Sequence, residues 1–137
     1  MNIFDGLRQQ AKLNPLNPAV SCGDTKYNYQ EFHDRVVKLG NALLDLGVKK
    51  GDRVATLLLN CHRYLELYYA TALIGAVVVP LNHRLAAAEL KYIMDDSDSE
   101  TLFVDKDLLP QIEPVFTELS KLKTKILASD VQVLPEG

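Results

Sequence analysis

The chain has 137 residues, 47% of them hydrophobic, and its 15 Lys and Arg against 18 Asp and Glu give a formal net charge of −3. This length suits a single domain over residues 1–137, and the composition supports a packed core, which disfavours wholesale disorder. No basic run is long enough to follow a phosphate backbone, so nucleic acid is not expected as a partner.

Cysteine usage and the N-terminus favour a soluble cytoplasmic protein. Cys22 and Cys61 belong to no Cys-x-x-Cys or metal-ligand spacing, so we expect reduced thiols and no metal site. The first residues lack the continuous apolar stretch of a signal peptide. The longest apolar run, residues 70–81, is shorter than the roughly 20 residues that span a bilayer, so no transmembrane segment is expected.

The first 30 residues predict a helix followed by a small hairpin. Apolar residues recur at helical spacing in Ile3, Phe4, Leu7 and Ala11. Two Asn-Pro pairs at 14–15 and 17–18 end this helix, because proline disfavours the helical conformation of its predecessor. Residues 19–22 and 26–29 then flank Gly-Asp, which is typical of a hairpin turn.

A second helix follows with the clearest periodicity in the chain. Its apolar stripe takes Phe32, Val36, Leu39, Leu43 and Leu46.

The ends of this helix are marked by three further residues. Asn28 and Glu31 have the spacing of a capping pair, and Gly47 is placed for a left-handed C-terminal cap. Gly40 lies inside the helix, where glycine costs about 1 kcal/mol relative to Ala, so we expect another backbone to pack closely there.

Strands then alternate with helices. We expect buried strands at 54–59, 76–79 and 101–104, helices at about 62–74 and 86–95, and a short final strand at 125–128. Pro110 and Pro114 break the helical period between them, which predicts a regular helix only after Pro114. This order predicts an α/β fold with a doubly wound, mainly parallel sheet flanked by helices, in addition to the small N-terminal hairpin.

Several of these segments occur in the order and spacing of the acyl-CoA synthetases, the AMP-binding, acyl-adenylate-forming ligases, which the chain resembles over residues 3–127. The segments are Tyr-Asn-Tyr-Gln-Glu-Phe at 27–32, Leu-Gly at 46–47, Gly-Asp-Arg-Val at 51–54, Leu-Ile-Gly-Ala-Val-Val-Val-Pro-Leu-Asn-His-Arg-Leu at 73–85 and Glu-Leu at 89–90. The Val-Val-Val-Pro-Leu-Asn variant with Arg84 is more similar to fatty-acyl or aryl CoA ligases than to amino-acid-activating domains.

The resemblance implies an N-terminal fragment of a ligase, a partial N-terminal subdomain of the adenylate-forming fold. The family activates a carboxylate with ATP and Mg, forms an acyl-adenylate, and transfers the acyl group to CoA as a thioester; a long-chain fatty acid is the implied substrate. None of the seven glycines here forms the family's phosphate loop, and the C-terminal domain with its catalytic lysine is absent from this sequence. We therefore expect the fragment alone to be inactive and to hold no cofactor of its own.

Arg84 is the one candidate site residue. In the family, the arginine of this segment lies near the phosphates of CoA in some members, and a guanidinium suits that contact. Here His83 replaces the family's usual proline, so an exposed or structurally paired arginine is the alternative.

The remaining polar residues favour structural roles. His33, His62 and His83 have no partner pattern for acid–base chemistry, which predicts helix-surface or loop histidines. The Asp residues at 95, 96 and 98 lack the glycine and distal glutamate of a calcium loop, which predicts a solvated turn.

Two other functions remain open at this point. The chain could be a standalone nucleotide- or CoA-binding module, using the carboxyl ends of its strands. It could also be a truncated paralogue that self-associates, as a homodimer, or pairs with a full-length ligase through an exposed sheet edge and apolar surface.

Overall fold

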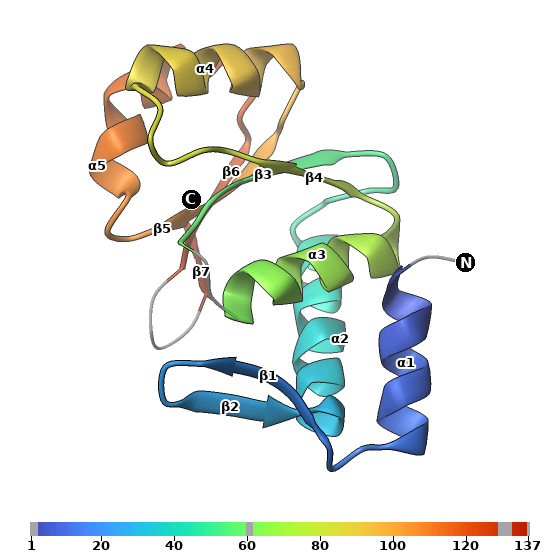
Figure 1. Cartoon of the computed structure of the whole chain (residues 1–137). Helices are drawn as coiled ribbons and strands as arrows, with labels where there is room; N and C mark the ends of the chain where they lie inside the picture. Colours follow the sequence, from blue (N-terminus) through green and yellow to red (C-terminus); the bar gives the residue numbers. More distant parts are fainter. Residues whose placement is uncertain (1–2, 60–61, 129–132, 137) are drawn as a thin grey trace. The chain divides into compact units, whose positions relative to one another are not determined.

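The computed structural model describes residues 3–59, 62–128 and 133–136. The chain forms two compact units, each with its own elements (Figure 1). Unit 1 takes Met1–Lys50 and Asn60–Ala76, and unit 2 takes Gly51–Leu59 and Val77–Gly137.

Unit 1 contains three helices and a two-stranded antiparallel hairpin among its described residues, as the sequence predicts. Its elements are α1 (Ile3–Leu13), β1 (Pro18–Cys22), β2 (Thr25–Asn28), α2 (Tyr29–Asp45) and α3 (His62–Ile74).

Both predicted ends of α2 are confirmed. The Glu31 N–H donates to Asn28 Oδ1 at 2.8 Å, and the Asn28 N–H donates to Glu31 Oε1 at 2.9 Å, which completes a capping box. At the other end Gly47 has a φ of +93°, and the N–H groups of Gly47 and its successor donate to the carbonyls of Leu44 and Leu43. This pair of bonds is a Schellman motif, which satisfies carbonyls that the helix leaves open.

The buried side of α2 contacts α3 at Gly40. A Cβ built there would lie 3.1 Å from Leu73 Cδ2 and 3.9 Å from the Ala70 carbonyl oxygen, so α3 packs closely here through a side chain more than through the backbone that we expected. The predicted stripe is shorter than expected, because Leu46 follows the end of α2 and is 37% exposed. The Schellman turn redirects the chain at that point, which removes Leu46 from the periodicity of the helix.

A charged network also joins α2, α3 and β2. Arg35 Nε and Nη2 donate to the two carboxylate oxygens of Glu66 at 3.0 and 3.1 Å, and its guanidinium lies 4.6 Å from the centre of the Tyr27 ring. His62 Nε2 lies 3.8 Å from Glu66 Oε1. Glu66 is only 5% exposed, and a buried carboxylate is tolerated when a bidentate partner replaces water.

Unit 2 is built on a five-stranded sheet of order β4-β3-β5-β6-β7, in which only the β6–β7 pair is antiparallel. The α/β fold with a mainly parallel sheet is confirmed. The elements of this unit are β3 (Arg53–Leu57), β4 (Val77–Pro80), α4 (Ala87–Asp96), β5 (Thr101–Asp105), α5 (Leu109–Ile112), the 3₁₀ helix η1 (Glu113–Glu118), β6 (Thr124–Ala128) and β7 (Val133–Glu136).

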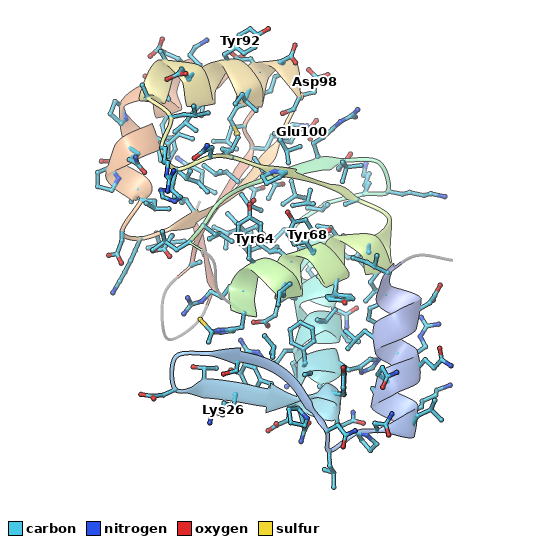
Figure 2. The ribbon with its side chains drawn as sticks, viewed as in Figure 1. Lys26, Tyr64, Tyr68, Tyr92, Asp98 and Glu100 are labelled. Atoms are coloured by element: carbon cyan, nitrogen blue, oxygen red, sulfur yellow. The ribbon has the colours of Figure 1, made fainter. Side chains whose placement is uncertain are left out.

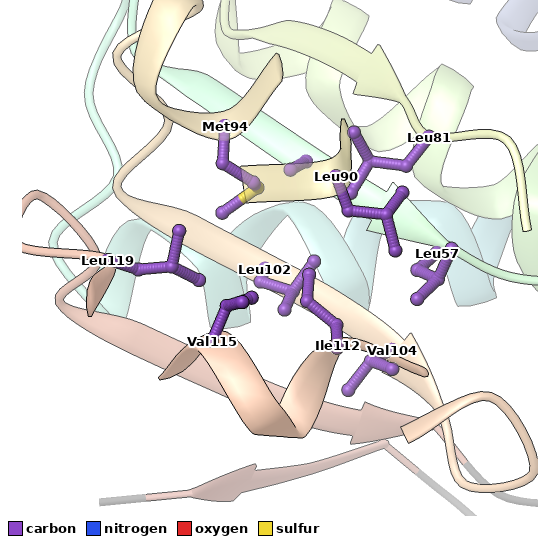
Figure 3. Close-up of a cluster of buried hydrophobic side chains, with 10 residues drawn as sticks. Leu57, Leu81, Leu90, Met94, Leu102, Val104, Ile112, Val115 and Leu119 are labelled. Carbon is purple, nitrogen blue, oxygen red and sulfur yellow. The ribbon is translucent and has the colours of Figure 1, made fainter. Parts of the chain in front are cut away.

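A core lies between one face of this sheet and the helices α4, α5 and η1 (Figure 3). The helices contribute side chains at helical spacing, such as Leu90 and Met94 of α4, and the strands contribute alternate residues, such as Leu102 and Val104 of β5. Burial against the sheet therefore holds short helices that would not be stable alone.

Strand β4 corrects one prediction. The second strand of this alternation is not buried: it lies at the edge of the sheet, Val77 is 46% exposed, and Pro80 belongs to the strand. A central strand forms hydrogen bonds to a neighbouring strand on each side, and a proline has no N–H to donate to them. It is therefore compatible with an edge strand and not with a central one.

The segment that contains Pro110 and Pro114 corrects a second prediction. The regular helix expected after Pro114 is wrong, because an α-helical turn, α5, precedes Pro114 and only 3₁₀ turns follow. Pro110 and Pro114 each lie in the first turn of their element, where no intrahelical N–H bond is required. The strand at 124–128 is also not the last, since β7 pairs with it and contains Pro135.

Replacing Gly47 by Ala should lower the free energy of unfolding by about 1–2 kcal/mol, because a Cβ disfavours the left-handed backbone. Gly6→Ala is a matched control: neither glycine has an atom within 4 Å of an added Cβ, but Gly6 lies in α1 without a positive φ. There the change should raise stability by about 0.5–1 kcal/mol. Urea unfolding measures both, and equal effects of the two changes would contradict this account of the cap.

The stability of the chain should fall as the pH is lowered from 6.5. Burial lowers the pKa of His62 below 6.5, against the opposing effect of Glu66, and the charges of Arg63 and Arg35 lower it further. Between pH 6.5 and the lower pKa of the folded state, the His62 imidazole is therefore protonated in the unfolded chain and neutral in the folded chain. Up to about 1.4 kcal/mol is lost for each unit between the two pKa values.

The measurement is the free energy of urea unfolding at pH 7.5, 6.5 and 5.5 for the wild-type chain and His62→Gln. The variant should lose less stability than the wild type over this range. An unchanged slope in His62→Gln would show that another group causes the loss.

Candidate functional site

The carboxyl ends of the parallel strands in unit 2 form the candidate functional site. Ligands of open α/β sheets bind outside these ends, at the point where the strand order reverses. Here β4 lies on one side of β3 and β5 on the other, so the reversal is between β3 and β5. The segments 81–86 and 106–108, which follow β4 and β5, lie at this edge.

The segment after β4 forms a tight turn that carries Arg84. Asn82 Oδ1 accepts from the Arg84 N–H at 2.9 Å, and the Asn82 carbonyl accepts from the Leu85 N–H at 3.1 Å. This Asx-type turn follows directly from the sequence, because an asparagine side chain readily bonds to the backbone two residues on. The predicted site residue is therefore held by its backbone while its side chain is exposed.

Glu89 fixes the end of the same turn. Its Oε1 accepts from the Ala86 N–H at 3.1 Å at the start of α4. Ala86 is the N-cap of α4 and offers no side-chain acceptor, so Glu89 satisfies a backbone group at a helix start.

Gln111 of α5 holds the middle of the turn. Its Nε2 donates to the His83 carbonyl at 2.6 Å, between residues 28 positions apart in the sequence. Its Oε1 is buried and has no hydrogen-bond partner among the described residues. Sequence reasoning missed Gln111, because a single glutamine in a short helix has no pattern that distinguishes it from a surface residue.

The Arg84 guanidinium makes no hydrogen bond or ion pair within residues 3–59, 62–128 and 133–136. A guanidinium offers five N–H donors in a planar fork, which matches the oxygens of phosphate or carboxylate. Arg84 can therefore bind an anion without first breaking an ion pair with a described carboxylate.

The segment after β5 uses its polar groups internally. Asp105 Oδ1 accepts from the Asp107 N–H at 3.0 Å, and the Asp105 carbonyl accepts from the Leu108 N–H at 2.9 Å. The Lys106 N–H donates to the Ala128 carbonyl at 3.2 Å. These bonds close a turn and leave no row of backbone N–H groups of the kind that cradles phosphate.

The residues described here do not fit ATP phosphates or Mg²⁺. No glycine occurs between positions 51 and 75 or between 75 and 137, so neither β3, β4 nor β5 is followed by a glycine-rich loop. In the described part of the chain, no three His, Cys, Asp or Glu side chains are grouped to hold a metal ion. The exposed Arg84 guanidinium at this edge stays the predicted site residue.

Of the three acidic residues expected in a solvated turn, Asp95 and Asp96 end α4 and only Asp98 lies in the turn that follows. Asp98 has a φ of +56° and forms an ion pair with Lys121, whose ammonium lowers the pKa of the Asp98 carboxyl. Lys121 Nζ also donates to the Asp95 carbonyl at 3.1 Å. The pairing ties the end of α4 to the segment before β6.

The three histidines have separate structural settings. His33 lies against the Phe4 ring with centroids 5.5 Å apart, and His83 contributes its carbonyl to Gln111. His62 is 7% exposed within the Arg35–Glu66 network, so the surface position expected for it is wrong. A charged network across three elements is not visible as a sequence pattern.

Tyr64 and Tyr68 pack against each other on α3 (Figure 2). Their rings are nearly parallel, with centroids 5.3 Å apart and an interplanar angle of 15°. They line a cleft of about 510 Å³ with β1 in unit 1, and burial raises the pKa of Tyr68. Cys61, expected to be an inert thiol, lies outside the described residues.

None of the helices within the described ranges is both long and apolar enough to cross a membrane.

Comparison with known proteins identifies relatives of the chain. It is 35% identical to the long-chain-fatty-acid–CoA ligase of Thermus thermophilus over 100% of this chain and 26% of that protein. It is 34% identical to the 2-succinylbenzoate–CoA ligase of Bacillus thuringiensis subsp. konkukian over 81% of this chain and 23% of the relative. The chain thus spans about a quarter of the length of these curated relatives.

The structural comparison agrees. The N-terminal domain of FACL13 from Mycobacterium tuberculosis superposes with a TM-score of 0.90 and 32% identity, covering 96% of this chain and 35% of that one. The sequence profile described as AMP-binding enzyme matches residues 7–136. The chain therefore belongs to the AMP-binding enzyme family and matches the N-terminal region of its adenylate-forming acyl-CoA ligases.

Proposed function

We propose that this chain is the N-terminal part of an ATP-dependent carboxylate–CoA ligase that acts on a long-chain fatty acid. Such an enzyme forms an acyl-adenylate and then an acyl-CoA thioester. The observation that carries the proposal is the similarity to the Thermus thermophilus ligase, which extends over the full length of this chain. Residues 1–137 would then be one part of the larger AMP-binding domain, in a cytoplasmic enzyme.

In this proposal the chain contributes scaffold and one cationic contact. The parallel sheet of unit 2 holds the Asn82–Leu85 turn, and the exposed Arg84 guanidinium binds a phosphate of CoA. The chemistry that ATP and Mg²⁺ supply would depend on residues outside this sequence, because the loops after β3, β4 and β5 offer no phosphate cradle or metal ligands among the described residues. The chain alone would therefore be inactive.

Binding of CoA without catalysis is the alternative closest to this proposal. It needs no residue beyond those described here, since Arg84 has no ion pair there to compete with an anion. The two functions differ in whether the chain binds CoA with useful affinity by itself.

Self-association is a further candidate, favoured by exposed apolar side chains in unit 1. Leu13 is 65% and Leu16 is 82% exposed, and Leu44 is 49% exposed. Association would remove the apolar area of such exposed leucines from water.

The purified chain, mixed with a long-chain fatty acid, ATP, Mg²⁺ and CoA, should form no thioester, as measured by mass spectrometry. Thioester formation would contradict the proposed inactivity. Titration calorimetry at low ionic strength should detect weak CoA binding that Arg84→Gln reduces by about 10-fold, the effect of one charged hydrogen-bonding partner. Lys26→Gln, at an exposed lysine of β2 in unit 1, is the matched control, and an equal loss in that variant would show a merely non-specific charge effect.

Sedimentation velocity at high protein concentration should show dimers or larger species. The double change Leu13→Ser and Leu16→Ser should shift the distribution to monomer, since it removes the apolar contact area that drives association. Tyr92→Ser, at a side chain of α4 that is 69% exposed, should leave the distribution unchanged. A strictly monomeric wild-type chain would exclude this candidate.

A further inference from the structure

We propose that Gln111 is a positioning residue for Arg84: its side-chain amide fixes the Asn82–Leu85 turn and so sets where the guanidinium meets an anionic ligand. The turn itself follows from Asn82, but a turn of this kind is fixed only relative to its own backbone. Gln111 gives the turn a hydrogen bond to another element, in addition to the packing of Leu85 against the core of unit 2. The ligand half of this inference rests on the proposed CoA contact of Arg84.

The geometry of the contact is specific. Gln111 Nε2 lies 2.6 Å from the carbonyl oxygen of His83, the residue directly before Arg84. The Gln111 backbone is itself held in α5, where its N–H donates to the Leu108 carbonyl at 3.0 Å. The next residue, Ile112, is fully buried in the core of unit 2. The amide is therefore carried by a packed helix and acts on a surface turn.

The environment of Gln111 Oε1 argues that the side chain does more than fill space. Gln111 Oε1 is buried without a hydrogen-bond partner among the described residues. Burying an acceptor in this way is unfavourable, and a methionine of similar length would fill the space without that cost. A glutamine at this position is explained if the hydrogen bond from its Nε2 to the His83 carbonyl offsets the cost of burying Oε1.

The turn has two further restraints, which makes the contribution of Gln111 separable. Asn82 Oδ1 holds the Arg84 N–H, and Glu89 holds the start of α4. Without Gln111 these bonds remain, so the turn would still form but could move relative to the sheet edge. The global fold should be unaffected, because the apolar contacts of Ile112 are retained.

The test compares Gln111→Met with Gln30→Met in the full chain. Gln30 is a matched control: it is exposed at the start of α2 in unit 1, and its Nε2 donates to Asp34 Oδ1 at 2.9 Å. Three quantities are measured for each variant. They are the urea midpoint, the amide hydrogen-exchange rates of Arg84 and Leu85 by NMR, and the ratio of the dissociation constants for pantetheine and CoA.

The pantetheine-to-CoA ratio combines the contributions of the phosphates and of the adenosine, both of which pantetheine lacks. The change of this ratio in Arg84→Gln isolates the part that depends on the guanidinium. Gln111→Met should leave the urea midpoint unchanged or raise it. Exchange at Arg84 and Leu85 should become about 3- to 10-fold faster, the factor for one lost hydrogen bond. The pantetheine-to-CoA ratio of Gln111→Met should fall toward the ratio of Arg84→Gln. The double variant, with both changes, should have the same ratio as Arg84→Gln alone. Gln30→Met should match the wild type.

Three results would overturn the proposal in different ways. If Gln111→Met keeps wild-type exchange and the wild-type ratio, Gln111 does not position the turn. If it lowers the urea midpoint and accelerates exchange at all amides while the ratio is kept, its role is structural only. If the wild-type chain binds pantetheine and CoA equally, the Arg84 contact and the ligand half of this inference are wrong, while the exchange rates still decide the positional half.

Discussion

The parallel pairing of β3 with both β4 and β5 is the constraint on which unit 2 depends. Parallel neighbours cannot be joined by a tight turn, so each connection becomes a long crossover that returns the chain to the same end. All the strand carboxyl ends therefore meet at one edge. The turn with Arg84 and the turn after Asp105 lie there for this reason, and not because either segment prefers that location by its own composition.

Local signals predicted the fold well where one residue decides a backbone conformation. The Asn28–Glu31 pair and the positive φ at Gly47 could both be predicted, because each depends on a few neighbouring residues. The exposed edge position of β4 could not be predicted, because three consecutive valines are typical of a buried strand. Only the order of the sheet shows that this strand lies at an edge. Strand β7 was not predicted either; it lies at the other edge of the sheet, where its proline is tolerated.

The candidate site was only half predictable for a related reason. Arg84 lies in a segment with family spacing, and Asn82 gives its turn a local cause. The residues of the Gln111–His83 bond are 28 positions apart in the sequence, and those of the Arg35–Glu66 pair are 31 positions apart. A single sequence contains no pattern that links residues so far apart. The glycines and prolines thus identify the family through the fold, while the contacts that orient side chains depend on tertiary packing.

The proline of β4 has a consequence for how this chain can meet other chains. The Val77 N–H donates to the carbonyl of Asp52, just before β3, and the Leu81 N–H donates to the carbonyl of Thr56 in β3. The alternate residues Val78 and Pro80 therefore direct their backbone groups away from β3. Pro80 has no N–H, which leaves Val78 alone among the strand residues to donate to an added strand. The edge is thereby a poor template for amyloid-like stacking, and contacts between copies would have to be made by side chains.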